Sequence, residues 1–210
     1  MNDVEVRFDI KKLKENFFYC VKEELNKFAK TKENKDVYAI VFDCDNSVGQ
    51  VVIRAGNIKR YKESLIDFDK YADMYEPYGK IGIRGYKYSV GDFDFIEVTF
   101  NEYVTKFFDI YYYVMTGEEP YYDYEDEDYE EETVIDVTLE MKQDYKIFFE
   151  ELILDCINKL KNVTENIDKT DDFIMYMCYH DCSDEDAEEL MKKTVDKELF
   201  EKLLKDSYIN

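Results

Sequence analysis

Histidine and proline are scarce in this sequence and tryptophan is missing: the 210 residues include one His, two Pro and no Trp. With a single histidine, any hydrolytic triad has to be built around His180. The sequence also lacks the Gly-x-Gly-x-x-Gly turn of dinucleotide-binding folds, the Walker-type Gly-Lys-Ser/Thr loop, the Gly-x-Ser-x-Gly elbow and the His-Glu-x-x-His zinc motif. No motif therefore indicates a cofactor, and we expect none.

Positive charge is also in short supply. The chain has 28 basic residues against 50 acidic ones, which gives a formal net charge of −22. A field of this sign repels nucleic acid phosphates and anionic membrane surfaces, and it attracts cationic partners over a long range. We therefore expect no direct binding to nucleic acid and no binding to membranes, and we expect the partner to be a basic protein.

Long apolar runs are missing as well. The first ten residues, MNDVEVRFDI, have no apolar stretch behind a basic region, as a secretory signal would. No run of about 18 apolar residues is present that could span a membrane. The five cysteines are odd in number and lie mostly among apolar residues, which is typical of reduced, buried thiols. These features predict a cytoplasmic location.

What the chain does contain is enough to build a core, since 45% of its residues are hydrophobic and 17% aromatic. We expect one domain over residues 1–210. Apolar residues recur at three- and four-residue steps, which predicts helices over 9–29, 58–74, the second half of 93–115, and 138–162. Apolar, β-branched runs predict strands at 37–42, 50–54 and 173–179, the first two forming a hairpin.

The arrangement of these elements indicates the fold class. Helices and strands do not alternate regularly, so we predict an α+β fold with a small antiparallel sheet, several packed helices and an acidic insertion. Asp9 is placed to cap the first helix, and Ser183 with Asp186 resembles a capping box. Thr194 is the predicted cap of a last helix that runs through Leu204. Residues 80–90 are rich in glycine and predict one edge strand or an irregular loop.

The acidic insertion, residues 118–132, is the first candidate site. Ten of its fifteen residues are acidic, four are Tyr, one is Pro and none is basic. It is expected to form a mobile, solvated loop, and a second interpretation makes it a docking surface for a basic protein. The candidate binding residues are Tyr121, Tyr122, Tyr124, Glu125, Asp126, Glu127, Asp128 and Tyr129. Calcium is less well matched, because the segment lacks the glycine and spacing of an EF-hand loop.

The second candidate is the segment from Val41 to Val48, in which Asp43 and Asp45 follow an apolar strand. It resembles the nucleophile loop of haloacid-dehalogenase-type phosphohydrolases, and the resemblance implies that Asp43 is phosphorylated, Asp45 acts as acid and base, and both help hold magnesium. The favoured interpretation is a turn made by Asp43, Asp45, Asn46 and Gly49. The second strand also follows too soon for the parallel fold of those enzymes.

The third candidate is Cys178-Tyr-His180-Asp-Cys182. Two thiols and an imidazole can bind zinc, but a four-ligand site needs a further partner. A Cys178–His180 nucleophile pair is the next option, although side chains two residues apart on a strand lie about 6.6 Å from each other. The favoured interpretation is a core strand that ends in a turn, with Cys178 buried and His180 partly exposed.

The layout of the chain resembles a bacterial family of domains of unknown function (the 4303 type) found among candidate toxin-immunity proteins. The matching parts are 38–43, 50–57, 145–160 and 173–181. The resemblance implies a protein that neutralises a toxin made by the same or a neighbouring bacterium.

The leading hypothesis is therefore a non-catalytic binding protein, such as an immunity protein, that blocks a basic toxin through its acidic, Tyr-rich surface. A toxic nuclease fits, because its active site is itself positive. The alternatives are a magnesium-dependent phosphohydrolase that uses Asp43 and Asp45, a Cys178/His180 enzyme, and a structural assembly subunit.

Overall fold

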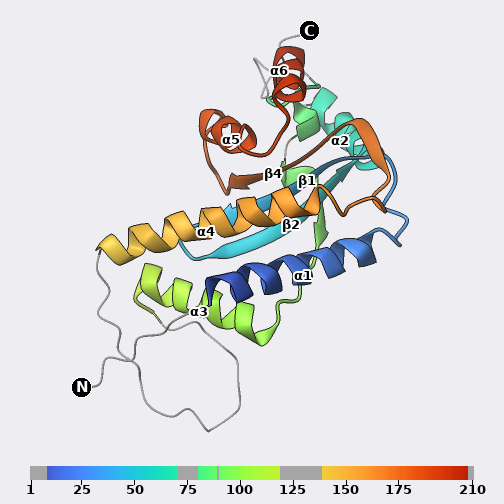
Figure 1. The fold of residues 1–210 in the computed structure, drawn as a ribbon. Helices are drawn as coiled ribbons and strands as arrows, with labels where there is room; N and C mark the ends of the chain where they lie inside the picture. The colour runs from blue at the N-terminus through green and yellow to red at the C-terminus, as the bar shows by residue number, and fades with distance from the viewer. Residues whose placement is uncertain (1–8, 71–79, 89, 119–138, 208–210) are drawn as a thin grey trace, which may run out of the picture.

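The computed structural model describes residues 9–70, 80–88, 90–118 and 139–207, which form a four-stranded sheet between two layers of helices (Figure 1). The strands are β1 (Val37–Asp45), β2 (Gln50–Asn57), β3 (Asp94–Ile96) and β4 (Lys169–Tyr179). The helices are α1 (Ile10–Phe28), α2 (Ile58–Lys70), α3 (Glu102–Thr116), α4 (Leu139–Leu160), α5 (Asp184–Met191) and α6 (Lys197–Asp206), with 3-10 turns η2 (Tyr86–Tyr88) and η3 (Val90–Asp92). Within these ranges, no helix is long and apolar enough to cross a membrane.

The sheet has the strand order β3-β2-β1-β4 and confirms the predicted α+β class. The β1–β2 hairpin and the β2–β3 pair are antiparallel, as expected, whereas β1 and β4 run parallel. The parallel pair arises because the chain passes through α4 before it returns to the sheet as β4. The carboxyl ends of β1 and β4 therefore meet at one edge of the sheet, and this decides where the candidate site lies.

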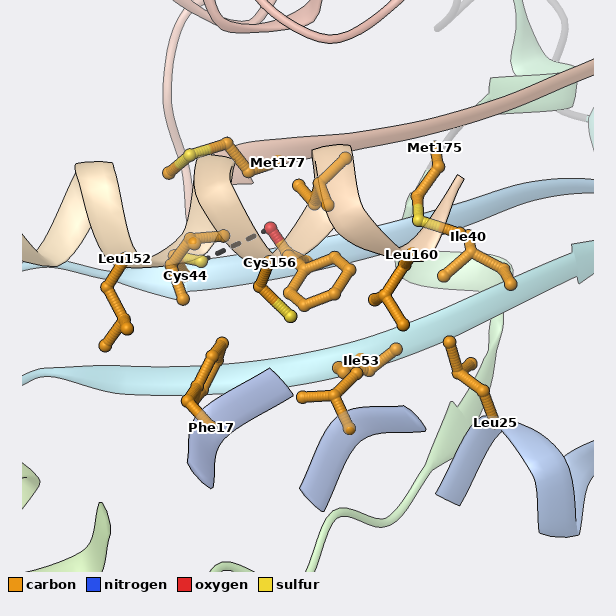
Figure 2. Packing of buried hydrophobic residues seen from close by; sticks show 14 of the residues in the cluster. Phe17, Leu25, Ile40, Cys44, Ile53, Leu152, Cys156, Leu160, Met175 and Met177 are labelled. Atoms are coloured by element: carbon orange, nitrogen blue, oxygen red, sulfur yellow. Dashed lines mark hydrogen bonds between the residues drawn. The ribbon is translucent and has the colours of Figure 1, made fainter. Parts of the chain in front are cut away.

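One face of the sheet packs against α1, α3 and α4. The predicted face of α1 is buried from Leu13 to Phe28, while Ile10 is exposed, and Phe17 and Leu25 point from α1 toward the sheet (Figure 2). Cys156 of α4 and Cys44 of β1 belong to the same cluster (Figure 2). All five cysteines are free, and Cys44, Cys156 and Cys178 are buried, which confirms the predicted burial for these positions.

The opposite face packs against α5, α6 and the segment that contains η2 and η3. Side chains alternate between the two faces along a strand, so Val41 and Asp43 lie on this second face while Phe42 and Cys44 lie on the first. The wall formed by the η2 segment is tied to α6, because the backbone N–H of Ile83 donates to the carbonyl of Leu203.

Two helix starts were predicted correctly and one was wrong. Asp9 accepts from the Lys12 N–H at the start of α1, and Ser183 accepts from the Asp186 N–H at the start of α5. Thr194 does not cap α6, because the hydroxyl of Thr194 donates to the carbonyl of Met191. Asp196 is the cap, and its carboxylate accepts from two backbone N–H groups of the first turn.

Several strand boundaries differ from the prediction: β1 and β2 end at Asp45 and Asn57 and not at 42 and 54. Strand β4 begins at Lys169 and not at 173, so it includes Asp171 and Asp172. The polar start is kept in the strand by side-chain partners: the Lys87 ammonium lies 2.5 Å from the Asp172 carboxylate. For residues 80–90 the predicted alternative of an irregular loop is confirmed, since the described residues form 3-10 turns and irregular structure, and the edge strand lies at 94–96.

Candidate functional site

The acidic insertion that was predicted as a docking surface lies almost entirely outside the described residues. The candidate residues Tyr121, Tyr122, Tyr124, Glu125, Asp126, Glu127, Asp128 and Tyr129 lie outside the described residues, as does the rest of the acidic insertion beyond Glu118. The docking surface therefore remains a prediction from sequence.

The other two candidate segments meet in one place. A cleft of about 410 Å³ opens at the carboxyl ends of β1 and β4, between α5 and the η2–η3 segment. We call it the β1–β4 cleft. Its polar and sulfur-bearing lining includes Asp43, Arg54, Arg84, Tyr176, Cys178 and His180. Asp43 comes from one predicted motif and Cys178 and His180 from the other, 135 and 137 residues further along the chain.

The strand register explains this meeting. Asp43 of β1 is paired with Cys178 of β4, so both side chains point to the same face of the sheet. On the other side of β1, Arg54 of β2 is paired with Val41 and with Phe95 of β3, again on that face. Asp43 and Cys178, with Arg54 beside them, thus form the floor of the cleft.

Asp43 is the centre of the site. Arg54 Nε donates to Asp43 Oδ2 over 2.9 Å, and His180 Nδ1 lies 3.3 Å from Asp43 Oδ1. Asp43 and Arg54 are almost fully buried, with side chains only 7% and 12% exposed, whereas the His180 side chain is 56% exposed. The guanidinium of Arg54 also lies over the ring of Phe95, with 4.2 Å between Cζ and the ring centroid.

Asp45 does not join this cluster. Its Oδ1 accepts hydrogen bonds from the backbone N–H and the hydroxyl of Ser47, at 2.8 and 2.5 Å. This is the hydrogen-bonded turn expected for an aspartate between two strands, and it confirms the predicted hairpin turn at Asp45, Asn46 and Gly49. The prediction that Asp43 belongs to this turn was wrong, because Asp43 lies within β1 and is paired with Cys178 of β4. Gly49 closes the turn with a φ of +74°, a conformation that favours glycine.

The thiols of the site are held in the protonated state. Burial and the nearby Asp43 carboxylate raise the pKa of Cys178, and burial also raises the pKa of Cys182. A thiol of raised pKa is a poor nucleophile and a poor metal ligand, because both roles require the thiolate. Cys178 is buried and His180 exposed, as the interpretation of this segment as a strand end predicted.

No arrangement of carboxylate, imidazole and thiol groups suited to a metal ion occurs among the residues that the structure describes. The zinc interpretation of Cys178, His180 and Cys182 and the magnesium interpretation of Asp43 and Asp45 therefore gain no support from the geometry.

Three residues of the cleft were not predicted as site residues. Arg54 was assigned to a strand and given no role, although hairpin register places it on the same face as Asp43. Arg84 forms ion pairs with Glu188, through a short contact, and with Glu185 at 3.6 Å. Tyr176 is completely buried, and its hydroxyl has no hydrogen-bond partner among the described residues. A polar group in this state is rare in folded proteins and marks a position that calls for an explanation.

Searches of protein-family models, of curated proteins and of solved structures found no significant match to this chain.

Proposed function

We propose that this protein is a non-catalytic binding protein of the cytoplasm that occludes a basic partner protein, in the manner of an immunity protein that neutralises a toxin. The observation that carries the proposal is the net charge of −22, combined with an insertion in which ten of fifteen residues are acidic and four are Tyr. Such a surface accelerates encounter with a positive partner, and tyrosine offers flat contact area at low entropic cost.

The described part of the surface supports the same role. The first turn of α5 is acidic throughout, with Asp184, Glu185 and Asp186, and their side chains are exposed. Asp181, at the turn before α5, is 92% exposed. Acidic groups at this end of the molecule add to the attraction that a basic partner would experience.

The chemistry of the β1–β4 cleft favours binding over catalysis. A phosphohydrolase of the type that the 41–48 segment resembles needs Asp43 as a free nucleophile, but its carboxylate is engaged by Arg54 and His180. A cysteine nucleophile needs a thiolate, whereas the pKa of Cys178 is raised. Assay of generic phosphoesters with magnesium, on the wild type and on Asp43→Asn, tests this: turnover that Asp43→Asn abolishes would contradict the proposal.

Capture of partners on the immobilised protein tests the proposal itself. We expect a basic protein to be retained from lysate of the source organism at low salt and released at moderate salt. A first variant replaces Glu125, Asp126, Glu127 and Asp128 by Asn. A control replaces the exposed Glu15, Glu97, Glu198 and Glu201 by Gln, which lowers the net charge equally, from −22 to −18 (−22 + 4).

The two variants separate a docking surface from bulk charge. The proposal predicts that the first variant loses the partner and the control retains it. Equal retention by both variants, or retention of nothing but abundant ribosomal proteins, would contradict a role for the acidic insertion.

A further inference from the structure

The β1–β4 cleft gathers the scarce positive groups of a strongly acidic chain. The sequence contains four arginines and one histidine, and Arg54, Arg84 and His180 all line this cleft. Asp43, Asp181 and Asp184 line the same cleft, so these positive groups are set among carboxylates. Positive groups held together inside a concave site are the usual basis for recognition of an anion.

Arg54 is fixed in place and has donors left over. Its Nε donates to Asp43, and the ring of Phe95 covers one face of the guanidinium. A guanidinium carries five N–H donors. Within the described part of the chain, Arg54 uses the Nε donor for its hydrogen bond to Asp43, and the donors of its two terminal amino groups remain for a ligand. Because Arg54 is already ordered, little further entropy is lost when a ligand accepts from its terminal amino groups.

Arg84 differs from Arg54 in this respect. Its guanidinium pairs with Glu188 and Glu185, which neutralise it within the wall of the cleft. We therefore assign the anion-binding role to Arg54 and regard Arg84 as part of the wall.

Tyr176 provides an independent observation at the same place. Tyr176 of β4 and Arg54 of β2 flank Val41 on the same face of the sheet, since both are paired with that residue in register. The Tyr176 hydroxyl is buried and has no partner among the described residues. A buried hydroxyl without a hydrogen bond destabilises a fold, and a ligand oxygen at this position would satisfy it.

The location and size of the cleft suit a small molecule. Ligands of open sheets commonly bind beyond the carboxyl ends of parallel strands, which is where β1 and β4 end. A volume of about 410 Å³ falls within the range of roughly 300 to 1,000 Å³ typical of small-molecule pockets. A larger groove of about 680 Å³ beside the start of α2 is less suitable, because Arg60 in its lining is paired with Glu63 and Asp94.

We propose that the β1–β4 cleft binds a small molecule through an oxyanion, a carboxylate or a phosphate, which accepts hydrogen bonds from Arg54 and from the Tyr176 hydroxyl. The Asp43 carboxylate holds Arg54 in place through the hydrogen bond to Nε, and His180 lies in the lining of the same cleft. The site does not depend on the acidic insertion or on a protein partner.

Titration with simple anions tests this, with inorganic phosphate and acetate as the probes and amide resonances of the folded protein as the readout. Ionic strength is held constant with sodium chloride, so that screening does not change. We expect saturable shifts at residues 178–182. Tighter binding of phosphate identifies a phosphate-bearing ligand, and tighter binding of acetate identifies a carboxylate. Absence of a saturable response to both anions would overturn the proposal.

Variants separate the proposed contacts from general charge effects. Tyr176→Phe is expected to weaken binding about fivefold, the value of one ordinary hydrogen bond, and Arg54→Lys about tenfold, because the fork is lost while the charge beside Asp43 is kept. Arg60→Lys on α2 is the matched control and should bind as the wild type does. Unchanged affinity in both cleft variants would overturn the assignment.

The same Tyr176→Phe variant has a second readout that does not involve a ligand. Without anion, its thermal midpoint should equal or exceed that of the wild type, because the unpaired hydroxyl is gone. A clear fall in the midpoint would mean that the hydroxyl already has a partner, and it would remove Tyr176 from the site.

Discussion

Replacement of Asp43 by alanine removes one half of an ion pair that the sheet keeps almost completely out of water. The two side chains are 7% and 12% exposed and are 2.9 Å apart, and Asp43 also faces His180. When one partner of a buried pair is deleted, the other charge is left without compensation, and this costs about 3 to 5 kcal/mol. We expect Asp43→Ala to lower the free energy of unfolding by that amount.

A double-mutant cycle shows whether the loss arises from the pair. Arg54→Ala alone should also be strongly destabilising, but the double variant should lose less than the sum of the two single losses, because no uncompensated charge remains. Urea unfolding at pH 7, followed by circular dichroism, measures each free energy. The exposed Lys197–Glu201 pair of α6, at 3.8 Å, is the control and should show a coupling of about 0 to 1 kcal/mol.

The cycle can refute the reasoning. A loss below about 1 kcal/mol for Asp43→Ala would place this pair with surface salt bridges. Asp43 would then be available for chemistry, and the argument that its carboxylate is engaged by Arg54 would fail.

Three further predictions concern single positions. Gly49→Ala should lower the free energy of unfolding by at least about 2 kcal/mol, because φ is +74° and the new Cβ would lie 2.5 Å from Tyr111 Cδ1. Gly91→Ala is the control and should change the free energy of unfolding by less than about 0.5 kcal/mol, because nothing lies within 4 Å of the new Cβ. Equal effects of the two substitutions would contradict the close packing at Gly49. Burial raises the pKa of Asp109 to about 6, so its charged form penalises the fold progressively as pH rises from about 4 through 6. Asp109→Asn should therefore raise the free energy of unfolding at pH 7 by about 1 kcal/mol, after allowance for solvent screening at a partly exposed site, and leave it unchanged near pH 3. An equal gain at both pH values would be inconsistent with this. Burial also raises the pKa of Cys44 and Cys156, so a thiol reagent at pH 8 should reach these buried thiols only on unfolding. In the native state the reagent should modify the partly exposed Cys20 first and Cys182 more slowly, because burial raises the pKa of Cys182 too. Rapid modification of Cys156 would show that the core opens locally.

The parts of the fold that depend on local pattern were predictable. The helical face of α1, with Leu13, Phe17 and Val21, follows from three- and four-residue spacing, and all three are fully buried. The cap at Ser183 follows from its own sequence neighbours. The β1–β2 hairpin follows from two apolar runs around a polar turn, and its turn hydrogen bonds are local to Asp45 and Ser47.

The candidate site was predictable only in pieces, because its geometry depends on a non-local pairing. Asp43 and His180 were considered in separate motifs, and the sequence has no signal that β4 pairs in parallel with β1. Arg54 could have been placed beside Asp43 from hairpin register alone, but its burial depends on Phe95 of β3, which joins the sheet about forty residues later. Thr194 was predicted as the cap of the last helix, whereas Asp196 is the cap. Both residue types suit the position, and only the path of the chain after α5 decides between them.

The most direct test of the central claim is the salt dependence of the dissociation constant for the protein captured as partner, measured with the wild type, the insertion variant and the charge-matched control. If the acidic insertion docks a basic protein, affinity for the wild type and for the control should fall steeply and in parallel as salt rises. The variant with Glu125, Asp126, Glu127 and Asp128 replaced by Asn should bind more weakly at low salt and show a flatter dependence. Coincident curves for all three proteins would contradict the account, because the charge would then serve only to keep the chain soluble.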